Sequence, residues 1–214
     1  AGASSVVVRD GHGDGLNLHR AQIDERVDLV SGATPGRRFG AFEGSSALIL
    51  LGYHAMAGAK GALLEHTFSS KTIQNIWLNG KKAGEIAIDA AIAAEYSVPV
   101  IMVSGDDKAC AEAEDWLPGV VSCEVKKSFS VNSALLYSLE KTKELIIQKT
   151  IEAINAYKKG EIKPLALEYP VSFRKEFVER MAPDLPERGN MRWIDGRTME
   201  IKGDSVEQML LGNY

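Results

Sequence analysis

The sequence predicts an α/β fold in which a mostly parallel sheet is flanked by helices, with a smaller α+β part at the C-terminal end. Three nearly continuous apolar runs, VVVRD (6–10), SALILLGYH (46–54) and VPVIMVSGD (98–106), have the pattern of parallel strands that are buried on both faces. Between the last two runs, GEIAIDAAIAAEY (84–96) has the composition of a helix that covers the sheet. Strands that alternate with helices are typical of an α/β domain.

Further elements continue this pattern to about residue 138. IQNIWLNGKKAGE (73–85) predicts a strand and an Asn79-Gly80 turn that lead into the helix. KACAEAEDWL (108–117) predicts a short second helix, with Asp106 or Asp107 available as its cap, and VVSCEVKKSFS (120–130) predicts another strand. We therefore assign residues 1–138 to an α/β metal-binding domain.

The pattern changes after residue 138. LEKTKELIIQKTIEAINAYKK (139–159) is a long amphipathic helix, and residues 163–177 and 191–203 show the alternation of strands. Asp204 with Glu207 predicts a capping box at the start of a last helix. No linker or internal repeat separates this region, so we assign residues 139–214 to a smaller α+β part.

The α+β part is expected to serve in oligomerisation and as a cover for the site. Apolar positions in LALEYPVSF (165–173) and MRWI (191–194) exceed what a small layer needs for its own core. Surplus apolar surface usually marks an interface, so the sequence predicts subunit contacts here.

Composition excludes several classes of protein. The chain has 214 residues, 45% of them hydrophobic and 25% charged, which is typical of a soluble globular protein. Its formal net charge of −4 provides no basic field for nucleic acid. No apolar run approaches the roughly 20 residues that span a membrane, so we expect a cytoplasmic protein without a membrane partner. Cys110 and Cys123 are expected to be reduced and structural.

Side chains that carry chemistry gather where the predicted strands end. Asp10 and His12 follow the first strand and His54 ends the second, while Glu85 stands near the start of a helix. In open α/β sheets ligands bind outside the carboxyl ends of the strands. Neutral imidazole and ionised carboxylate are the usual non-sulfur ligands of zinc, so this edge is a candidate site for zinc or another divalent ion.

The same residues also have simpler interpretations, which the pattern alone leaves open. A histidine at the end of a strand is more often a hydrogen-bonded loop residue than a metal ligand. Asp106 and Asp107 are equally suited to capping a helix, and Glu95 to a solvated position on the helix surface.

Four blocks of the sequence share their order with one known family. RDGHGDGLNL, LLGYHAMAG, LLEHTFSS and LNGKKAGEIAIDAAIAAEYSVPVIMVSGDD together resemble the zinc-dependent D-aminopeptidase family that is associated with bacterial dipeptide-transport operons. The resemblance covers residues 4 to about 130 strongly and the remainder loosely. It implies a cytoplasmic metallo-aminopeptidase that hydrolyses short peptides with an N-terminal D-amino acid, such as D-Ala-D-Ala-type peptides. It also implies a homodecamer around a central channel.

The resemblance assigns roles to particular residues. The family's metal-binding histidines correspond to His12 and His54, and its metal-binding glutamate to Glu85. The family's catalytic histidine corresponds to His66, and the family assigns it the role of a nucleophile. A role of His66 in acid/base catalysis or in stabilising the transition state is equally compatible with the sequence. The two histidines of one loop are therefore expected to have different functions.

One family motif has no match in this chain. The family opens with a strand ending in D-x-E-G, whose acidic residues complete a site for two zinc ions. We expect an upstream segment to supply these ligands, because His12, His54 and Glu85 are enough for one zinc site only. Two alternatives stay open: a metal-dependent amidase or L-peptidase, and a non-catalytic ligand-binding or assembly protein on the same scaffold.

Overall fold

The computed structural model describes residues 2–180 and 186–212, and the chain divides into two compact units, Ala1–Ser45 and Ser46–Tyr214. The first unit contains a short parallel pair of strands, β1 (Val7–Arg9) and β2 (Asp28–Val30), with a single turn of 3-10 helix at Arg20–Gln22 between them. The first predicted strand therefore exists, but its partner is β2, which the sequence did not predict.

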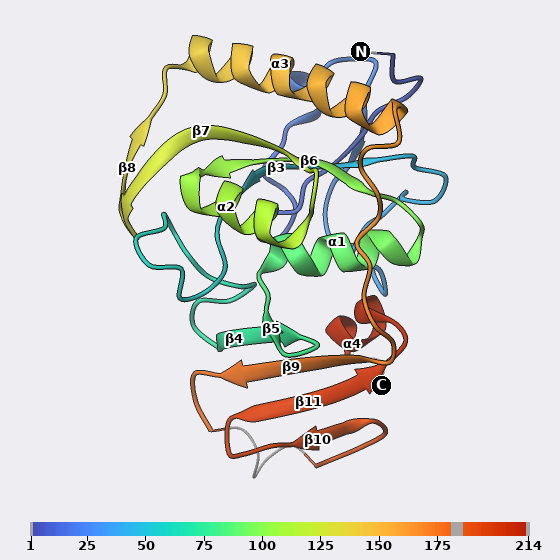
Figure 1. Ribbon diagram of the computed structural model, residues 1–214, viewed down its shortest axis with the longest axis vertical. Coiled ribbons are helices and arrows are strands. Elements are labelled where there is room, and N and C mark those ends of the chain that lie inside the picture. Colours follow the sequence, from blue (N-terminus) through green and yellow to red (C-terminus); the bar gives the residue numbers. More distant parts are fainter. Residues whose placement is uncertain (1, 181–185, 213–214) are drawn as a thin grey trace. The chain divides into compact units, whose positions relative to one another are not determined.

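The second unit contains the predicted parallel sheet. Its strands occur in the order β3 (Leu48–Tyr53), β6 (Val100–Asp106), β7 (Val121–Ser130) and β8 (Ser133–Leu136) (Figure 1). β3, β6 and β7 are parallel, and β8 adds an antiparallel edge. All seven residues of β6 are buried, which explains the unbroken apolar run of this strand.

Helices cover both faces of this sheet. α3 (Leu139–Lys158) lies along one face, while α1 (Glu85–Glu95) and α2 (Asp107–Trp116) lie on the other (Figure 1). One core cluster joins the sheet to α3 and the segment after it: Ile101, Met102, Val121, Cys123, Ala153 and Ile162. This arrangement confirms the predicted α/β class.

A second sheet of five strands is antiparallel throughout. Its order is β10 (Met191–Trp193), β11 (Thr198–Gly203), β9 (Val171–Phe177), β4 (Ile73–Leu78) and β5 (Lys81–Lys82). The Asn79-Gly80 turn between β4 and β5 is as predicted, with positive φ at both residues. Because β4 pairs with β9, and α3 packs on β6 and β7, elements on both sides of residue 138 share a sheet and a core. Residue 138 therefore does not mark a break in the packing.

α1 lies between the two sheets of this unit (Figure 1). Every residue from Ile86 to Ala93 is buried. Such a helix shows no amphipathic stripe because it is covered on all sides. Small residues, mainly alanine, let it fit into this layer.

The last helix, α4 (Val206–Leu211), begins one residue later than predicted. Ser205 is its N-cap, and its side chain accepts a hydrogen bond from the backbone N–H of Gln208, so the predicted cap at Asp204 is wrong. Ser205 also donates from Oγ to Glu95 at 2.8 Å, and the backbone N–H of Val206 donates to the same carboxylate. Glu95 therefore accepts hydrogen bonds at the start of α4, where a carboxylate is favoured, and is not merely a solvated charge.

The apolar residues of segments 165–173 and 191–194 differ in exposure. Val171 and Phe173 are fully buried and Met191 is 4% exposed, whereas Tyr169 and Ile194 are about half exposed. Leu165, Leu167 and Trp193 are only partly buried. Subunit contacts through residues 165–173 and 191–194 therefore stay a prediction. Among the described residues, no helix is both long and apolar enough to cross a membrane.

Asp106 connects α2 to the loop that follows β3, and its removal should destabilise the protein. Asp106 is buried; Oδ1 accepts from the backbone N–H of Ala109 at 2.8 Å, and Oδ2 accepts from that of Leu63 at 2.9 Å. Asp106→Ala removes a helix cap and leaves the Leu63 N–H without this acceptor, so the free energy of unfolding should fall by about 2–4 kcal/mol. Urea denaturation measures this loss. Asp115→Ala, at an exposed position of the same helix, should cost less than about 1 kcal/mol, and equal losses for the two variants would contradict the assignment.

Candidate metal centre

The loop between β3 and β4 brings His54 and His66 together. The backbone N–H of His66 donates to the carbonyl of Ala55 at 3.4 Å, and that of Ala57 donates to Thr67 Oγ1 at 3.1 Å. The second half of the loop is thus tied back onto the first half. As a result the two imidazole rings stack, with centroids 3.9 Å apart and an angle of 18° between their planes.

The backbone around His66 adopts unusual conformations. Leu64 and Phe68 have φ values of 52° and 60°, in the left-handed region that side chains other than glycine rarely occupy. The conformation is held by further contacts, including a hydrogen bond of 2.9 Å from the Leu64 N–H to the carbonyl of Val131. Strained conformations of this kind are stabilised by their surroundings and cluster at functional sites.

Glu85 faces both imidazoles from the first residue of α1. Its Oε1 lies 3.4 Å from Nε2 of His54 and 4.0 Å from Nε2 of His66. The same oxygen accepts a hydrogen bond of 2.8 Å from the backbone N–H of Phe68, and the N-terminus of α1 favours a carboxylate electrostatically. One ligand atom from each of His54, His66 and Glu85 lies within 4.8 Å of the others, as a shared metal ion requires.

Hydrogen bonds to the backbone determine which ring nitrogens face Glu85. Nδ1 of His54 lies 3.1 Å from the carbonyl of Ala55, and Nδ1 of His66 lies 2.6 Å from that of Leu64. A carbonyl can only accept, so both Nδ1 atoms carry hydrogen and both Nε2 atoms are directed to the carboxylate. Metal-binding histidines are commonly oriented in this way, with one nitrogen donating to the backbone and the other facing the metal.

A neutral His54 would place a nitrogen lone pair against the Glu85 carboxylate, which is unfavourable unless a cation lies between them. Burial alone lowers the pKa of His54. Hydrogen bonds to Glu85 and Ala55, with the charges of Glu85 and Glu112, outweigh this effect and raise the pKa above its ordinary value. The arrangement therefore favours a positive charge beside the Glu85 carboxylate.

Glu112 is a second carboxylate of this region, and sequence reasoning missed it. It belongs to α2 and is 6% exposed, and its Oε2 accepts from the backbone N–H of Met56 at 2.6 Å. Burial raises the pKa of Glu112 to about 7, against the lowering effects of the Met56 N–H and of His54. The available signal was its place on the apolar face of α2, between Ala109 and Trp116 at helical spacing.

His12 lies in the first unit, on a loop organised by Asp10. Asp10 is 4% exposed, and its carboxylate accepts from the backbone N–H groups of His12, Asn17 and Leu18. Burial raises the pKa of Asp10, but these hydrogen bonds lower it by more. Asp10 thus shapes the loop that carries the exposed His12. His54, His66 and Glu85 all belong to the second unit, so His12 is not part of the observed cluster and its role as a ligand stays a prediction.

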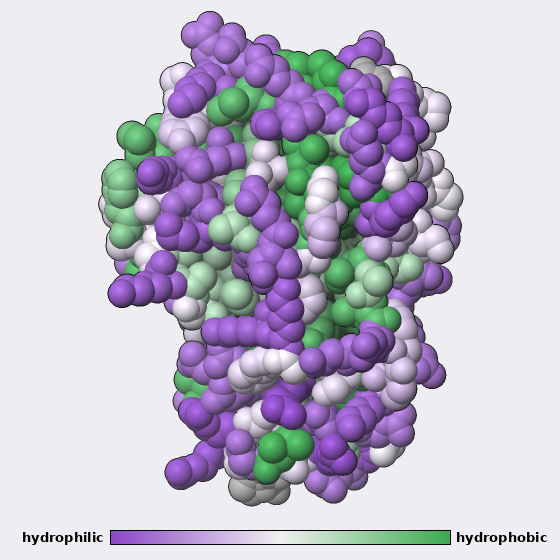
Figure 2. All heavy atoms as spheres, viewed as in Figure 1, coloured by the Kyte–Doolittle hydropathy of each residue, from purple (hydrophilic) through white to green (hydrophobic). Residues whose placement is uncertain are grey.

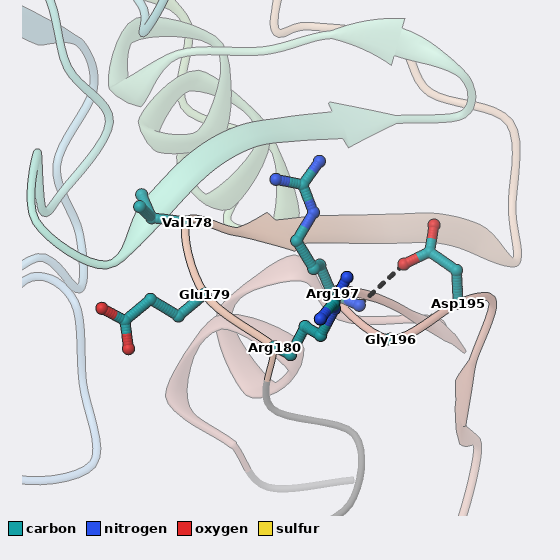
Figure 3. Close-up of a pocket in the computed structure, with 6 residues that line it drawn as sticks. All are labelled: Val178, Glu179, Arg180, Asp195, Gly196 and Arg197. Carbon is teal, nitrogen blue, oxygen red and sulfur yellow. Dashed lines mark hydrogen bonds between the residues drawn. The ribbon is translucent and has the colours of Figure 1, made fainter.

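A separate hollow of about 630 Å³ lies beyond the end of β9 and contains none of the predicted site residues. Its lining comprises Val178, Glu179, Arg180, Asp195, Gly196 and Arg197 (Figure 3). The Arg197 N–H donates to Asp195 Oδ1 at 2.7 Å, which closes a turn before β11. The charges of this hollow are mixed, and the chemistry of the chain concentrates at the histidine cluster instead.

The fold and this cluster define an α/β protein with a candidate site for a divalent metal. The family model described as D-aminopeptidase matches residues 1–211, and the chain belongs to this family. The match confirms the resemblance seen in the sequence.

A curated sequence and a solved structure are similar to this chain. The D-aminopeptidase of Bacillus subtilis (strain 168) is 32% identical over 169 residues, which are 77% of this chain and 60% of the relative. A solved structure, described as the Zn-dependent D-aminopeptidase DppA from Bacillus subtilis, a self-compartmentalizing protease, matches with a TM-score of 0.86 and 26% identity. That match covers 99% of this chain and 79% of the solved chain. The chain thus spans about 60% of the length of its curated relative.

Proposed function

We propose that the protein is a cytoplasmic, zinc-dependent aminopeptidase that hydrolyses short peptides with an N-terminal D-amino acid, such as D-Ala-D-Ala-type peptides. The observation that carries the proposal is the convergence of His54, His66 and Glu85, whose ligand atoms lie within 4.8 Å of one another. Membership of the D-aminopeptidase family and the similarity to a zinc-dependent relative support the same activity.

The residues of the cluster fit zinc. An imidazole nitrogen and a carboxylate oxygen are among its preferred donors, and the Nδ1 hydrogen bond of His54 already orients that ring for binding through Nε2. In the proposal His54 and Glu85 are ligands, and His12 is a further ligand contributed by the first unit. Two zinc ions would need acidic ligands in addition to these three residues. Bound zinc would supply electrophilic polarisation of the peptide carbonyl and an activated water.

In this proposal His66 is the catalytic residue. Its Nε2 is 4.0 Å from Glu85 Oε1, a longer separation than the 3.4 Å of His54, and its Nδ1 is fixed by the Leu64 carbonyl. Nε2 of His66 can therefore accept a proton at the site and return it to the leaving amine, because the ring retains its orientation in both states. Nucleophilic attack by the same atom and stabilisation of the transition state use the same geometry.

We further propose that the protein acts as a homo-oligomer, and specifically as a decamer. The solved relative is described as self-compartmentalizing, which supports assembly. In this chain, apolar side chains are exposed from the end of β7 to the start of α3, over the edge strand β8 (Figure 2): Phe129, Val131, Leu135, Leu136 and Leu139. An exposed apolar edge strand is a typical surface for association.

Zinc binding is the first expected outcome. Protein purified without chelator should contain zinc, and His54→Ala and Glu85→Ala should lose most of it because each removes a ligand. His19→Ala, which alters a histidine outside the cluster, should retain the metal. Elemental analysis measures the content. Absence of any divalent metal, with no gain on adding zinc, would refute the proposed cofactor.

His54 and His66 should differ in their effects on metal and turnover. His66→Ala should keep near-normal zinc and reduce turnover of D-Ala-D-Ala by about a hundredfold or more, the scale of a positioned acid/base group. His54→Ala should lose both. Metal content and hydrolysis are measured on the same samples, with L-Ala-L-Ala as the second substrate. If His66→Ala lost zinc and His54→Ala did not, His66 would be the ligand and His54 the catalytic residue. If L-Ala-L-Ala were hydrolysed faster than D-Ala-D-Ala, the proposed preference for an N-terminal D-amino acid would be wrong.

Assembly should depend on the β7–β8 edge. Light scattering at micromolar concentration should give a mass many times the 23.2 kDa of one chain, and Leu136→Asp should reduce it because a charge would be buried in the interface. Ile194→Asp, at a position about half exposed, tests the subunit contacts that the sequence predicts for residues 191–194. A monomeric wild-type protein would refute the assembly. Loss of assembly in Ile194→Asp but not in Leu136→Asp would place the interface at residues 191–194 and not at the β7–β8 edge.

A further inference from the structure

Glu112 occupies a position where a carboxyl group is costly. The buried residues of α2 around it, Ala109, Cys110, Ala113 and Trp116, are apolar, and its own side chain is 6% exposed. A buried carboxyl group reduces stability unless its hydrogen bonds and position compensate. Packing of α2 alone would favour an apolar residue at this position. The presence of a glutamate is therefore explained by the contacts that its carboxylate makes.

The Glu112 carboxylate lies between the two backbone segments that carry His54 and Glu85. Its Oε2 accepts from the backbone N–H of Met56 at 2.6 Å, two residues after His54. Its Oε1 lies beside Gly84, the residue immediately before Glu85 and the N-cap of α1; a Cβ at Gly84 would be only 2.4 Å from this oxygen. One side chain therefore contacts both segments at the point where they approach each other.

Gly84 is the counterpart of this arrangement. Its φ of −98° is accessible to any residue, so backbone conformation does not explain the glycine. The reason is space, because a Cβ would also come within 2.6 Å of Met56 Cβ. Contacts below 3 Å force the neighbours to move, so a side chain at residue 84 would push apart the segments that Glu112 holds together.

The separation of these segments determines the geometry of the metal centre. His54 and Glu85 are far apart in sequence, yet their ligand atoms are 3.4 Å apart. Zinc bonds to nitrogen and oxygen are about 2.0–2.2 Å long, and a shift of a few tenths of an ångström weakens a site. Residues outside the coordination sphere that orient ligands typically change metal affinity by 10–100-fold when they are altered.

We propose that Glu112 is a positioning residue of the metal centre, which sets the distance between His54 and Glu85 through its contacts with Met56 and Gly84. The role rests on the proposed zinc site but concerns residues that contact no metal themselves. It depends on the reach of the side chain and on an oxygen that accepts from Met56, not on negative charge.

Two substitutions of Glu112 distinguish the effect of its side-chain length from the effect of its negative charge. Glu112→Gln keeps the length and an acceptor oxygen but loses the charge, whereas Glu112→Asp keeps the charge but is one methylene too short to contact Met56 and Gly84 together. In the intact protein, Glu112→Asp should weaken zinc binding tenfold or more, as measured by competition with a chromophoric chelator. Glu112→Gln should stay within about threefold of the wild type. Glu114→Gln, at an exposed position of the same helix, should be unchanged.

A second measurement does not require zinc. In crystal structures of the metal-free variants, the distance from His54 Nε2 to Glu85 Oε1 should remain near 3.4 Å in Glu112→Gln and increase in Glu112→Asp. An unchanged distance and unchanged affinity in Glu112→Asp would overturn the proposal, as would a loss in Glu112→Gln alone. A wild-type protein that takes up no zinc would refute the proposed function, while the metal-free distances would still decide the role of Glu112.

Discussion

The position of the Glu85 carboxylate is the constraint on which the candidate site depends. Glu85 is the first residue of α1, and the rest of that helix is buried between two sheets from Ile86 to Ala93. A helix that is packed on all sides cannot shift or rotate without disrupting the core around it. The carboxylate is therefore held by the interior of the second unit, and the loop that carries His54 and His66 folds onto a fixed point.

The histidine loop is held against this fixed point by polar contacts, in addition to its buried residues Ala55, Ala57 and Ala62. Buried Thr67 and Asp106 accept hydrogen bonds from its backbone, and the Phe68 N–H donates directly to Glu85. Because loops have few apolar side chains to bury, such hydrogen bonds are the main means of giving a loop one conformation. The left-handed backbone at Leu64 and Phe68 is part of this conformation and orients His66 between them.

The sequence was sufficient for the elements with strong patterns. The apolar runs of β3 and β6 and the length of α3 predicted these elements directly, because a buried strand and a long amphipathic helix leave a clear signal. Short elements such as β2 and β8 were missed because three or four residues contain no reliable period. The pairing of β4 with β9 also could not be predicted, since strand order depends on contacts between residues distant in sequence.

Some residues of the candidate site could be predicted from the sequence, and others could not. His54 and Glu85 were found because the ends of strands and helices are where sites form, and the resemblance to the family added His66. The stacking of the two imidazoles was not predictable, because it results from the path of the loop between them. Glu112 was missed because a glutamate in a helix is usually exposed, and its place among the apolar positions of α2 was the one sign in the sequence that this side chain is buried.

The charges of the centre explain why such an arrangement is compatible with a stable fold. Glu112 lies close enough to Glu85 for that charge to add to the rise in the pKa of Glu112, while the pKa of His54 is also raised. Burial is the main cause of the raised pKa of Glu112, whereas hydrogen bonds to Glu85 and Ala55 and the nearby carboxylates raise the pKa of His54 against the effect of burial. A divalent cation at the facing Nε2 and Oε1 atoms would offset the negative charge of these carboxylates more effectively than one proton. A cation bound as proposed would therefore make the buried carboxylates of this region more favourable, and its binding would add to the stability of the fold.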